Sequence, residues 1–334
     1  MESNIIEFLR KEVVNGLFQT TTMQTVWNVW QNKIREILPQ NCNEQDFLNL
    51  GDYLSDIFKS TGGEGRAQGE LSGGGNAWES LIVWYINICC VNTRVVAFKK
   101  MGQVPLPIKE AITVNYENFS CSTESDITVV IFPDEDCFTS KEDAHIFFNS
   151  RGKYMKKELD KEVGEYFDKF SIGIIQCKTN WNDNAQIPML WDMIYSAGGF
   201  RGRQISVGVN NYSIQSLDSF TYSFVTVPSN KLSNFKPNSV SVKRVKGLSG
   251  GNYWGRITEQ GIARSVKEIF NNYNSGFDNK NIRTTLKNAV SHIEEYTEAL
   301  KKRETGRNTP EKGIRLMTIH AAKGSRRPSG LRKT

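Results

Sequence analysis

Two short apolar runs, each beside charged residues, constrain the fold of this 334-residue chain more than any other feature. The run Ser125–Phe132 has Asp126 as its second residue. The run Ile172–Lys178 ends with Gln176-Cys177-Lys178. Side chains alternate between the faces of a strand, so Gln176 and Lys178 project from the same side. If the two runs form neighbouring strands, a carboxylate, an amide oxygen and a lysine meet at one sheet edge. Such groups can hold a divalent cation, a water molecule and a phosphate.

Hydrophobic periodicity predicts an α/β fold, with a central mixed β-sheet flanked by helices. Residues 1–60 have helical spacing, and Asn76 is placed to cap a helix from Ala77 to about Val91. Runs rich in β-branched and aromatic residues predict the strands. The predicted strands are 111–116, 126–132, 171–177, 203–209, 219–227 and 239–245, and further helices are expected at 141–150, 153–170, 184–197 and 259–303.

Composition is that of an ordinary globular protein, with 38% hydrophobic and 23% charged residues. The longest apolar stretch, Leu81–Val91, is too short to span a bilayer, and the first residues lack the pattern of a signal peptide. We therefore expect a cytoplasmic protein that makes no membrane contact. The six cysteines include no CxxC pair and only three histidines accompany them, which argues against a structural zinc site.

The motif formed by Asp126 and Gln176-Cys177-Lys178 resembles that of the PD-(D/E)xK nuclease superfamily, in particular type II restriction endonucleases. Gln176 stands where the family usually has Glu or Asp, and Ser125 stands where it has Pro. The resemblance implies a restriction-endonuclease-like core and Mg²⁺-dependent, sequence-specific cleavage of double-stranded DNA. It also implies a homodimer, since two-fold protein symmetry matches a palindromic site.

The resemblance assigns roles to the motif residues. Asp126 and Gln176 would hold the metal together with the backbone carbonyl of Cys177, and Lys178 would align the attacking water. Glu79 on the helix before the first motif strand would supply a further carboxylate. Other interpretations stay open: Glu79 as a first-turn residue favoured by the helix dipole, Asp126 as a turn residue and Lys178 as an exposed strand end.

Three further segments are candidates for DNA recognition because they combine amides, arginines, lysines, aromatics and glycines. Helix capping or a glycine-rich surface hairpin explains the same residues equally well. The candidate DNA-binding residues are Asn180, Asn182, Asn184, Arg201, Arg203, Lys243, Arg244, Lys246, Asn252, Tyr253 and Arg256.

The net charge of +6 comes from the C-terminal end, where residues 301–334 hold eleven Lys or Arg and two Glu. This end is expected to be a flexible tail, or a sequence-independent phosphate contact. Within it, residues 313–324 resemble a motif of superfamily 1 helicases, but no Walker loop accompanies them, so no helicase function is inferred.

These features predict an N-terminal helical region (1–60), a nuclease core with recognition loops (61–258), C-terminal helices (259–303) and a basic tail (304–334). The core would begin with a flexible segment, since residues 61–75 hold seven glycines. Two other functions stay open for the same fold. One is a DNA-binding protein with a decayed catalytic site, and the other is a structure-selective repair or resolvase nuclease.

Overall fold

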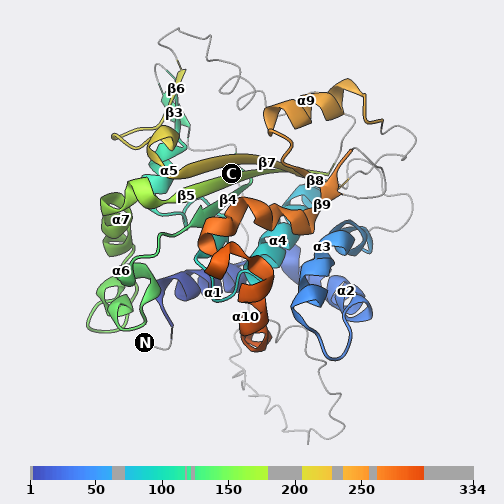
Figure 1. Ribbon diagram of the computed structural model, residues 1–334, viewed down its shortest axis with the longest axis horizontal. Coiled ribbons are helices and arrows are strands. Elements are labelled where there is room, and N and C mark those ends of the chain that lie inside the picture. The colour runs from blue at the N-terminus through green and yellow to red at the C-terminus, as the bar shows by residue number, and fades with distance from the viewer. Residues whose placement is uncertain are drawn as a thin grey trace, which may run out of the picture. The chain divides into compact units, whose positions relative to one another are not determined.

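A six-stranded mixed sheet organises the chain, as the sequence predicts (Figure 1). The computed structural model describes residues 3–61, 72–116, 119–121, 125–179, 205–227, 236–255 and 262–296. The first three strands of the sheet pair antiparallel, and the remaining pairs are parallel. In spatial order the strands are β1 (Val95–Phe98), β4 (Ile127–Ile131), β5 (Ser171–Lys178), β7 (Ser219–Thr226), β8 (Tyr253–Gly255) and β9 (Arg264–Ser265).

Strand direction decides which chain segments meet at each end of this sheet. Because β4 runs antiparallel to both β1 and β5, its first residue lies beside their last residues. β7 runs parallel to β5 and ends at the same place. We call this end of the sheet the β5 C-terminal edge; it collects Asp126 before β4, Lys99 after β1 and Lys178 at the end of β5.

Helices cover both faces of the sheet (Figure 1). The three helices predicted within residues 1–60 are present, and side chains of Asn4, Thr20 and Asn43 cap their N-termini. They share one hydrophobic core with the sheet and with the largely buried helix α4. No helix within the described residues has the length and apolarity needed to cross a membrane. The helices that share this hydrophobic core are α1 (Ile5–Phe18), α2 (Thr21–Ile37), α3 (Glu44–Lys59), α4 (Ser72–Cys89) and α10 (Ile282–Tyr296).

Helix α4 begins at Ser72, five residues before the predicted start at Ala77. Asn76 is therefore inside the helix and not its N-cap; its carbonyl accepts a hydrogen bond from Ser80 Oγ at 2.7 Å. Glu79 lies about two turns into the helix, so a first-turn dipole interaction does not explain it. Local sequence misled the prediction because glycines rarely start a helix, whereas burial of Trp78 and its neighbours favours this one.

The predicted strand at 239–245 is wrong, because these residues form helix α9 (Val240–Leu248). Ser239 caps it, accepting a hydrogen bond from the Val242 amide. Val242 and Val245, three residues apart, are both buried against aromatic residues of β7 and β8. Alternating β-branched residues gave a strand pattern, but the helical spacing of the buried valines decides the structure.

The other elements follow the prediction in part. Strands β1, β3, β8 and β9 were not predicted, and the predicted strand 203–209 includes β6, which belongs to a separate three-stranded sheet. Part of the predicted strand 111–116 is helical, and the predicted helix 184–197 lies outside the described residues. The separate sheet contains β3 (Phe119–Cys121), β2 (Val114–Tyr116) and β6 (Ile205–Val207). The remaining helices are α5 (Leu106–Ala111), α6 (Asp136–Thr139), η2 (Asp143–Phe147), α7 (Lys156–Glu165), η3 (Phe167–Lys169), η6 (Ile214–Ser216), η8 (Val266–Gly276) and η9 (Asp278–Lys280).

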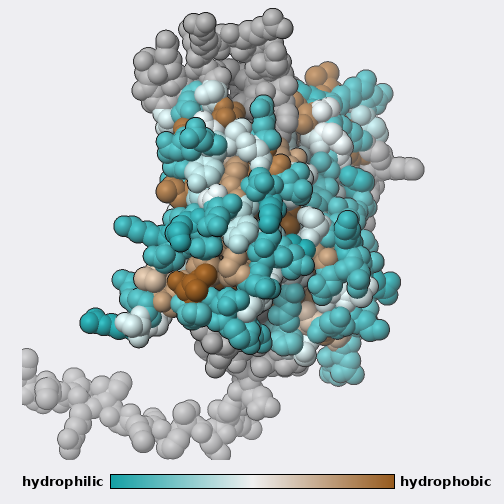
Figure 2. Space-filling model, turned by 60° about the vertical axis from the view of Figure 1, so that its left-hand side comes forward, coloured by the Kyte–Doolittle hydropathy of each residue, from teal (hydrophilic) through white to brown (hydrophobic). Residues whose placement is uncertain are grey.

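The surface carries few large apolar side chains. The face shown in Figure 2 is mostly hydrophilic, with small separate hydrophobic patches. Among the described residues, the exposed large hydrophobics lie on four different helices, which is the scatter expected of an ordinary surface. They are Val29, Tyr53, Leu106 and Val240.

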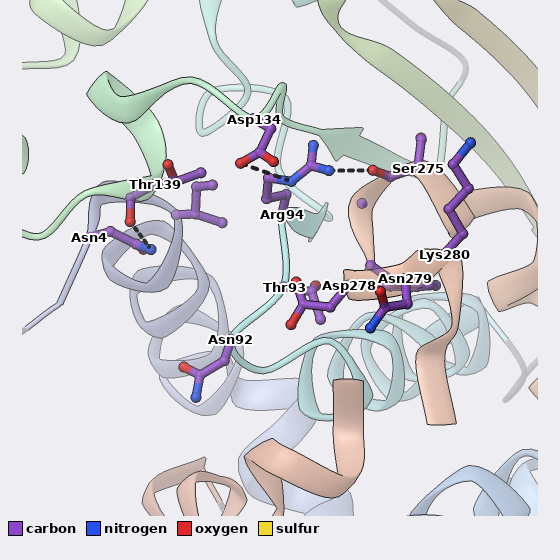
Figure 3. A pocket seen from close by; sticks show the side chains of 13 residues that line it. Asn4, Asn92, Thr93, Arg94, Asp134, Thr139, Ser275, Asp278, Asn279 and Lys280 are labelled. Atoms are coloured by element: carbon purple, nitrogen blue, oxygen red, sulfur yellow. Dashed lines mark hydrogen bonds and ion pairs between the residues drawn. The ribbon is translucent and has the colours of Figure 1, made fainter. Parts of the chain in front are cut away.

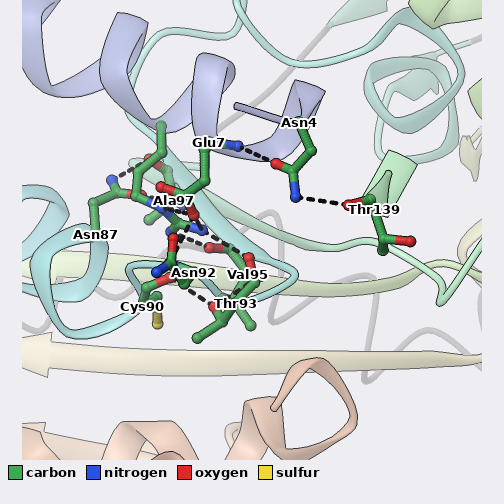
Figure 4. Close-up of polar contacts among 10 residues, drawn as sticks. Asn4, Glu7, Asn87, Cys90, Asn92, Thr93, Val95, Ala97 and Thr139 are labelled. Atoms are coloured by element: carbon green, nitrogen blue, oxygen red, sulfur yellow. Dashed lines mark hydrogen bonds and ion pairs between the residues drawn. The ribbon is translucent and has the colours of Figure 1, made fainter. Parts of the chain in front are cut away.

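A buried ion pair fixes helix α1 against the start of β1 (Figure 4). Arg10 is fully buried and bonds the Glu7 carboxylate, with Nε 3.0 Å from Oε1. Its guanidinium also donates to the carbonyls of Thr93 and Val95. Glu7 in turn accepts from the Asn92 amide at 2.8 Å. The pair thereby supplies partners to backbone groups in the turn between α4 and β1.

We expect Arg10→Met to lower the free energy of unfolding by about 3–5 kcal/mol, because it leaves the Glu7 carboxylate buried without its cation. Urea denaturation measures this loss. Arg283→Met, which removes an exposed arginine 3.6 Å from Glu44, is the control and should cost less than about 1 kcal/mol. Equal losses in the two variants would contradict a special role for the buried pair.

Candidate functional site

The two halves of the sequence motif meet at the β5 C-terminal edge. Ile127 pairs with Ile175, so the register places Asp126 opposite Gln176. The Asp126 carboxylate accepts a hydrogen bond from the Cys177 amide, with 2.7 Å between Oδ2 and N. Asp126 lies in the bend directly before β4, and this hydrogen bond fixes its carboxylate beside the motif strand β5.

Glu79 reaches the same edge from α4. Its side chain is 19% exposed, and Lys99 Nζ lies 3.3 Å from Oε2. Burial raises the pKa of the Glu79 carboxyl above its ordinary value, and the nearby charge of Asp126 raises it further. Lys99 and Lys178 oppose this shift. The charges of Asp126 and Lys178, which belong to two other elements, thus reach the Glu79 carboxyl.

Lys99 belongs to this cluster, although the sequence interpretation did not include it. It follows β1 directly, and its ammonium donates to the Asn76 carbonyl at 2.6 Å and to Ser80 Oγ at 2.9 Å. Together with Glu79 these contacts connect the end of β1 to α4. The available signal was the apolar run Val95–Phe98 followed by a lysine, which resembles the end of the motif strand at Lys178.

Cys177 can offer a divalent cation such as Mg²⁺ only its backbone carbonyl oxygen. Burial, followed by the charges of Asp126 and Glu79, raises the pKa of its thiol well above the ordinary value, so the sulfur stays protonated. The N–H and C=O of one strand residue point toward the same neighbouring strand in an antiparallel pair. Since the Cys177 amide points to Asp126, its carbonyl lies on that side as well.

Gln176 and Lys178 occupy the opposite face of β5 from the Cys177 side chain. Gln176 is 1% exposed, beside Phe224 of β7 in the register. Lys178 is half-buried at the strand end, where its carbonyl accepts bonds from Val227 N and Thr226 Oγ1, both at 2.9 Å. The end of the motif strand is therefore held firmly by β7.

The donor atoms at this edge fit Mg²⁺. Asp126 and Glu79 supply carboxylate oxygens, and Cys177 and Gln176 supply carbonyl-type oxygens, which are the ligands that this ion prefers. Within the described residues, no three side chains of His, Cys, Asp or Glu come together as a ready-made metal cluster. A Mg²⁺ ion held here would therefore rely on backbone, amide, water or phosphate oxygens besides two carboxylates.

The residues predicted to bind DNA lie in several parts of the chain: on α9, in the turn after it, in the core and outside the described residues. Lys243, Arg244 and Lys246 lie on α9 and not in a loop. Asn252 is half-buried in the turn after α9, and its carbonyl accepts from the Phe224 amide at 2.9 Å. Tyr253 is 1% exposed within the core, so the prediction of a DNA contact by its ring is wrong. Outside the described residues lie Asn180, Asn182, Asn184, Arg201, Arg203 and Arg256.

A cavity of about 610 Å³ lies at the other end of the sheet (Figure 3). It is lined by residues before β1, after β4 and around η9, and none of the motif residues contributes to it. Arg94 is one of the lining residues, and its guanidinium donates to the carbonyls of Phe132 at 2.7 Å and Ser275 at 2.5 Å. Asp134 lies 3.9 Å from the same guanidinium. Arg94 thus has a structural role there, and the cavity is separate from the β5 C-terminal edge.

Comparison with known proteins gave no match, either to a family model or to a curated protein sequence. The functional interpretation therefore rests on the residues and geometry of the β5 C-terminal edge.

The raised pKa of Glu79 predicts a pH-dependent stability of the metal-free protein. A carboxyl with a raised folded-state pKa favours folding below its unfolded pKa, and this contribution is lost as pH rises through the folded pKa. Glu79→Gln should therefore match wild type at about pH 4 and become relatively more stable toward about pH 8. Thermal unfolding in a chelator measures the difference. A difference that stays constant with pH would contradict the burial of this charge.

Proposed function

We propose that the protein is a Mg²⁺-dependent endonuclease that hydrolyses phosphodiester bonds in double-stranded DNA. One observation carries the proposal: Asp126, Glu79 and Lys178 come from separate elements to one sheet edge. The motif resembles that of type II restriction endonucleases, and on that basis we propose sequence-specific cutting by a homodimer.

In the proposed hydrolysis, the residues of the β5 C-terminal edge have two roles: some bind the metal ion and one aligns the water or the phosphate. Mg²⁺ bound there would stabilise charge on the phosphate and lower the pKa of a bound water. Asp126, oriented by the Cys177 amide, and Glu79, oriented by Lys99, would present oxygens to the ion. The Lys178 ammonium, at the end of a strand fixed by β7, aligns the attacking water or holds the scissile phosphate.

Helix α9 is the proposed DNA-contact element beside this edge. Val242 and Val245 hold it on the sheet face that carries Phe224, the register neighbour of Gln176. Lys243 is exposed on this helix, and Arg244 and Lys246 are half-buried. Cations on a helix can neutralise phosphates whatever the DNA sequence, so they would position the duplex without reading bases.

A second candidate function is DNA binding without hydrolysis. The observation in its favour is Gln176, a neutral and buried side chain where the nuclease family usually has a carboxylate. Such a protein would bind DNA equally well with magnesium or with a chelator. Cleavage assays separate the two functions directly.

The first test is incubation of the purified protein with unmethylated phage DNA, with Mg²⁺ or with a chelator. We expect discrete fragments only with Mg²⁺, and a loss of at least about 100-fold in Lys178→Ala with DNA binding retained. The control Lys153→Ala changes an exposed lysine in the segment before α7, outside both motif strands, and should cut normally.

Intact DNA under both conditions, with binding retained, would reject hydrolysis in favour of DNA binding alone. Cleavage confined to branched substrates would reject site-specific cutting and identify a structure-selective nuclease. Full activity in Lys178→Ala would remove Lys178 from the site.

Lys243→Ala should weaken DNA binding nearly equally for all sequences. If Lys243 neutralises one phosphate, the slope of log affinity against log salt concentration should fall by about 0.9. Fluorescence anisotropy across a salt series measures this slope, with exposed Lys287→Ala on α10 as the control. An unchanged slope in Lys243→Ala would exclude a phosphate contact by α9 at this position.

A further inference from the structure

Lys99 is a second lysine at the candidate metal site, and its contacts differ from those of a simple ion pair. Its shortest contacts are to neutral groups of α4, the Asn76 carbonyl at 2.6 Å and Ser80 Oγ at 2.9 Å. The Glu79 carboxylate is the most distant of the three, at 3.3 Å. An ammonium has three N–H donors, so these three contacts match its full capacity.

This geometry makes Lys99 a fixed charge. Its side chain is only 16% exposed, and two of its three contacts do not involve Glu79. If the Glu79 carboxylate turned toward a metal ion, the helix carbonyl and the hydroxyl would still hold the ammonium in place.

The charges of the four ionisable side chains at the edge cancel. When both carboxyls are ionised, Glu79 and Asp126 contribute two negative charges, and Lys99 and Lys178 contribute two positive charges. A divalent cation approaching the protein alone therefore meets no net negative charge, whereas a phosphate finds two ammonium groups. Coulomb interactions at a partly buried site are strong enough for one such charge to change an affinity severalfold.

We infer that Lys99 is a positioning residue that couples metal binding to DNA binding: its fixed charge keeps divalent cations weakly bound until a DNA phosphate completes the site. The inference rests on the proposed nuclease function. With DNA present, the phosphate supplies the negative charge that Lys99 offsets, and Lys99 continues to orient Glu79.

The test compares wild type, Lys99→Met, Lys99→Arg and the neighbouring exposed control Lys100→Met. Calorimetry measures Mg²⁺ binding to the protein alone, and Ca²⁺ binding to the protein with and without plasmid DNA. We expect Lys99→Met to bind Mg²⁺ alone about tenfold more tightly than wild type, and to gain less from added DNA. Lys99→Arg, which keeps the charge, and Lys100→Met should both resemble wild type.

Equal Mg²⁺ affinity of Lys99→Met and wild type, with a folded variant and a normal DNA effect in wild type, would overturn the role of Lys99 alone. Absence of any DNA effect on metal binding in wild type would overturn the coupling, whereas the proposed function itself fails only if DNA stays intact with Mg²⁺ in the cleavage assay. A purely structural role for Lys99 would lower the unfolding temperature without raising metal affinity, which also contradicts the inference.

Discussion

The register between β4 and β5 is the constraint on which the candidate site depends. Pairing of Ile127 with Ile175 places Asp126 opposite Gln176 and brings its carboxylate to the Cys177 amide. A slip of one residue would turn every side chain of β5 to the other face and take the Cys177 amide away from the Asp126 carboxylate. Because both faces of these strands are buried, the hydrophobic core itself holds the register and thereby the site.

Helix α4 contributes Glu79 to the candidate site, and burial of this carboxyl costs stability when it is charged. It places Glu79 where burial raises the pKa of the carboxyl, so the charged form needed for metal binding is disfavoured in the metal-free protein. Lys99 offsets part of that cost while connecting α4 to β1. Perturbed carboxyls with specific charge partners are typical of functional sites, although ion-pair networks without catalytic roles also produce them.

The sequence predicted the parts of this protein whose local and global preferences agree. The strands with Asp126 and Lys178 are continuous apolar runs, and the N-terminal helices have regular spacing and capping residues. It failed where tertiary burial outweighed local propensity, at the glycine-rich start of α4 and in α9. Lys99 was missed because β1 has only four residues, and no spacing rule connects its end to Glu79 on the preceding helix. Contacts between elements are decided by topology, which local patterns do not specify.

The central claim is that a divalent cation binds at the β5 C-terminal edge between Asp126, Glu79 and the Cys177 carbonyl. Anomalous diffraction from crystals grown with Mn²⁺ and a short DNA duplex locates such an ion directly. We expect an anomalous peak about 2.0–2.4 Å from an Asp126 carboxylate oxygen and close to the Cys177 carbonyl. A peak elsewhere, or none at this edge in crystals that contain DNA there, would contradict it.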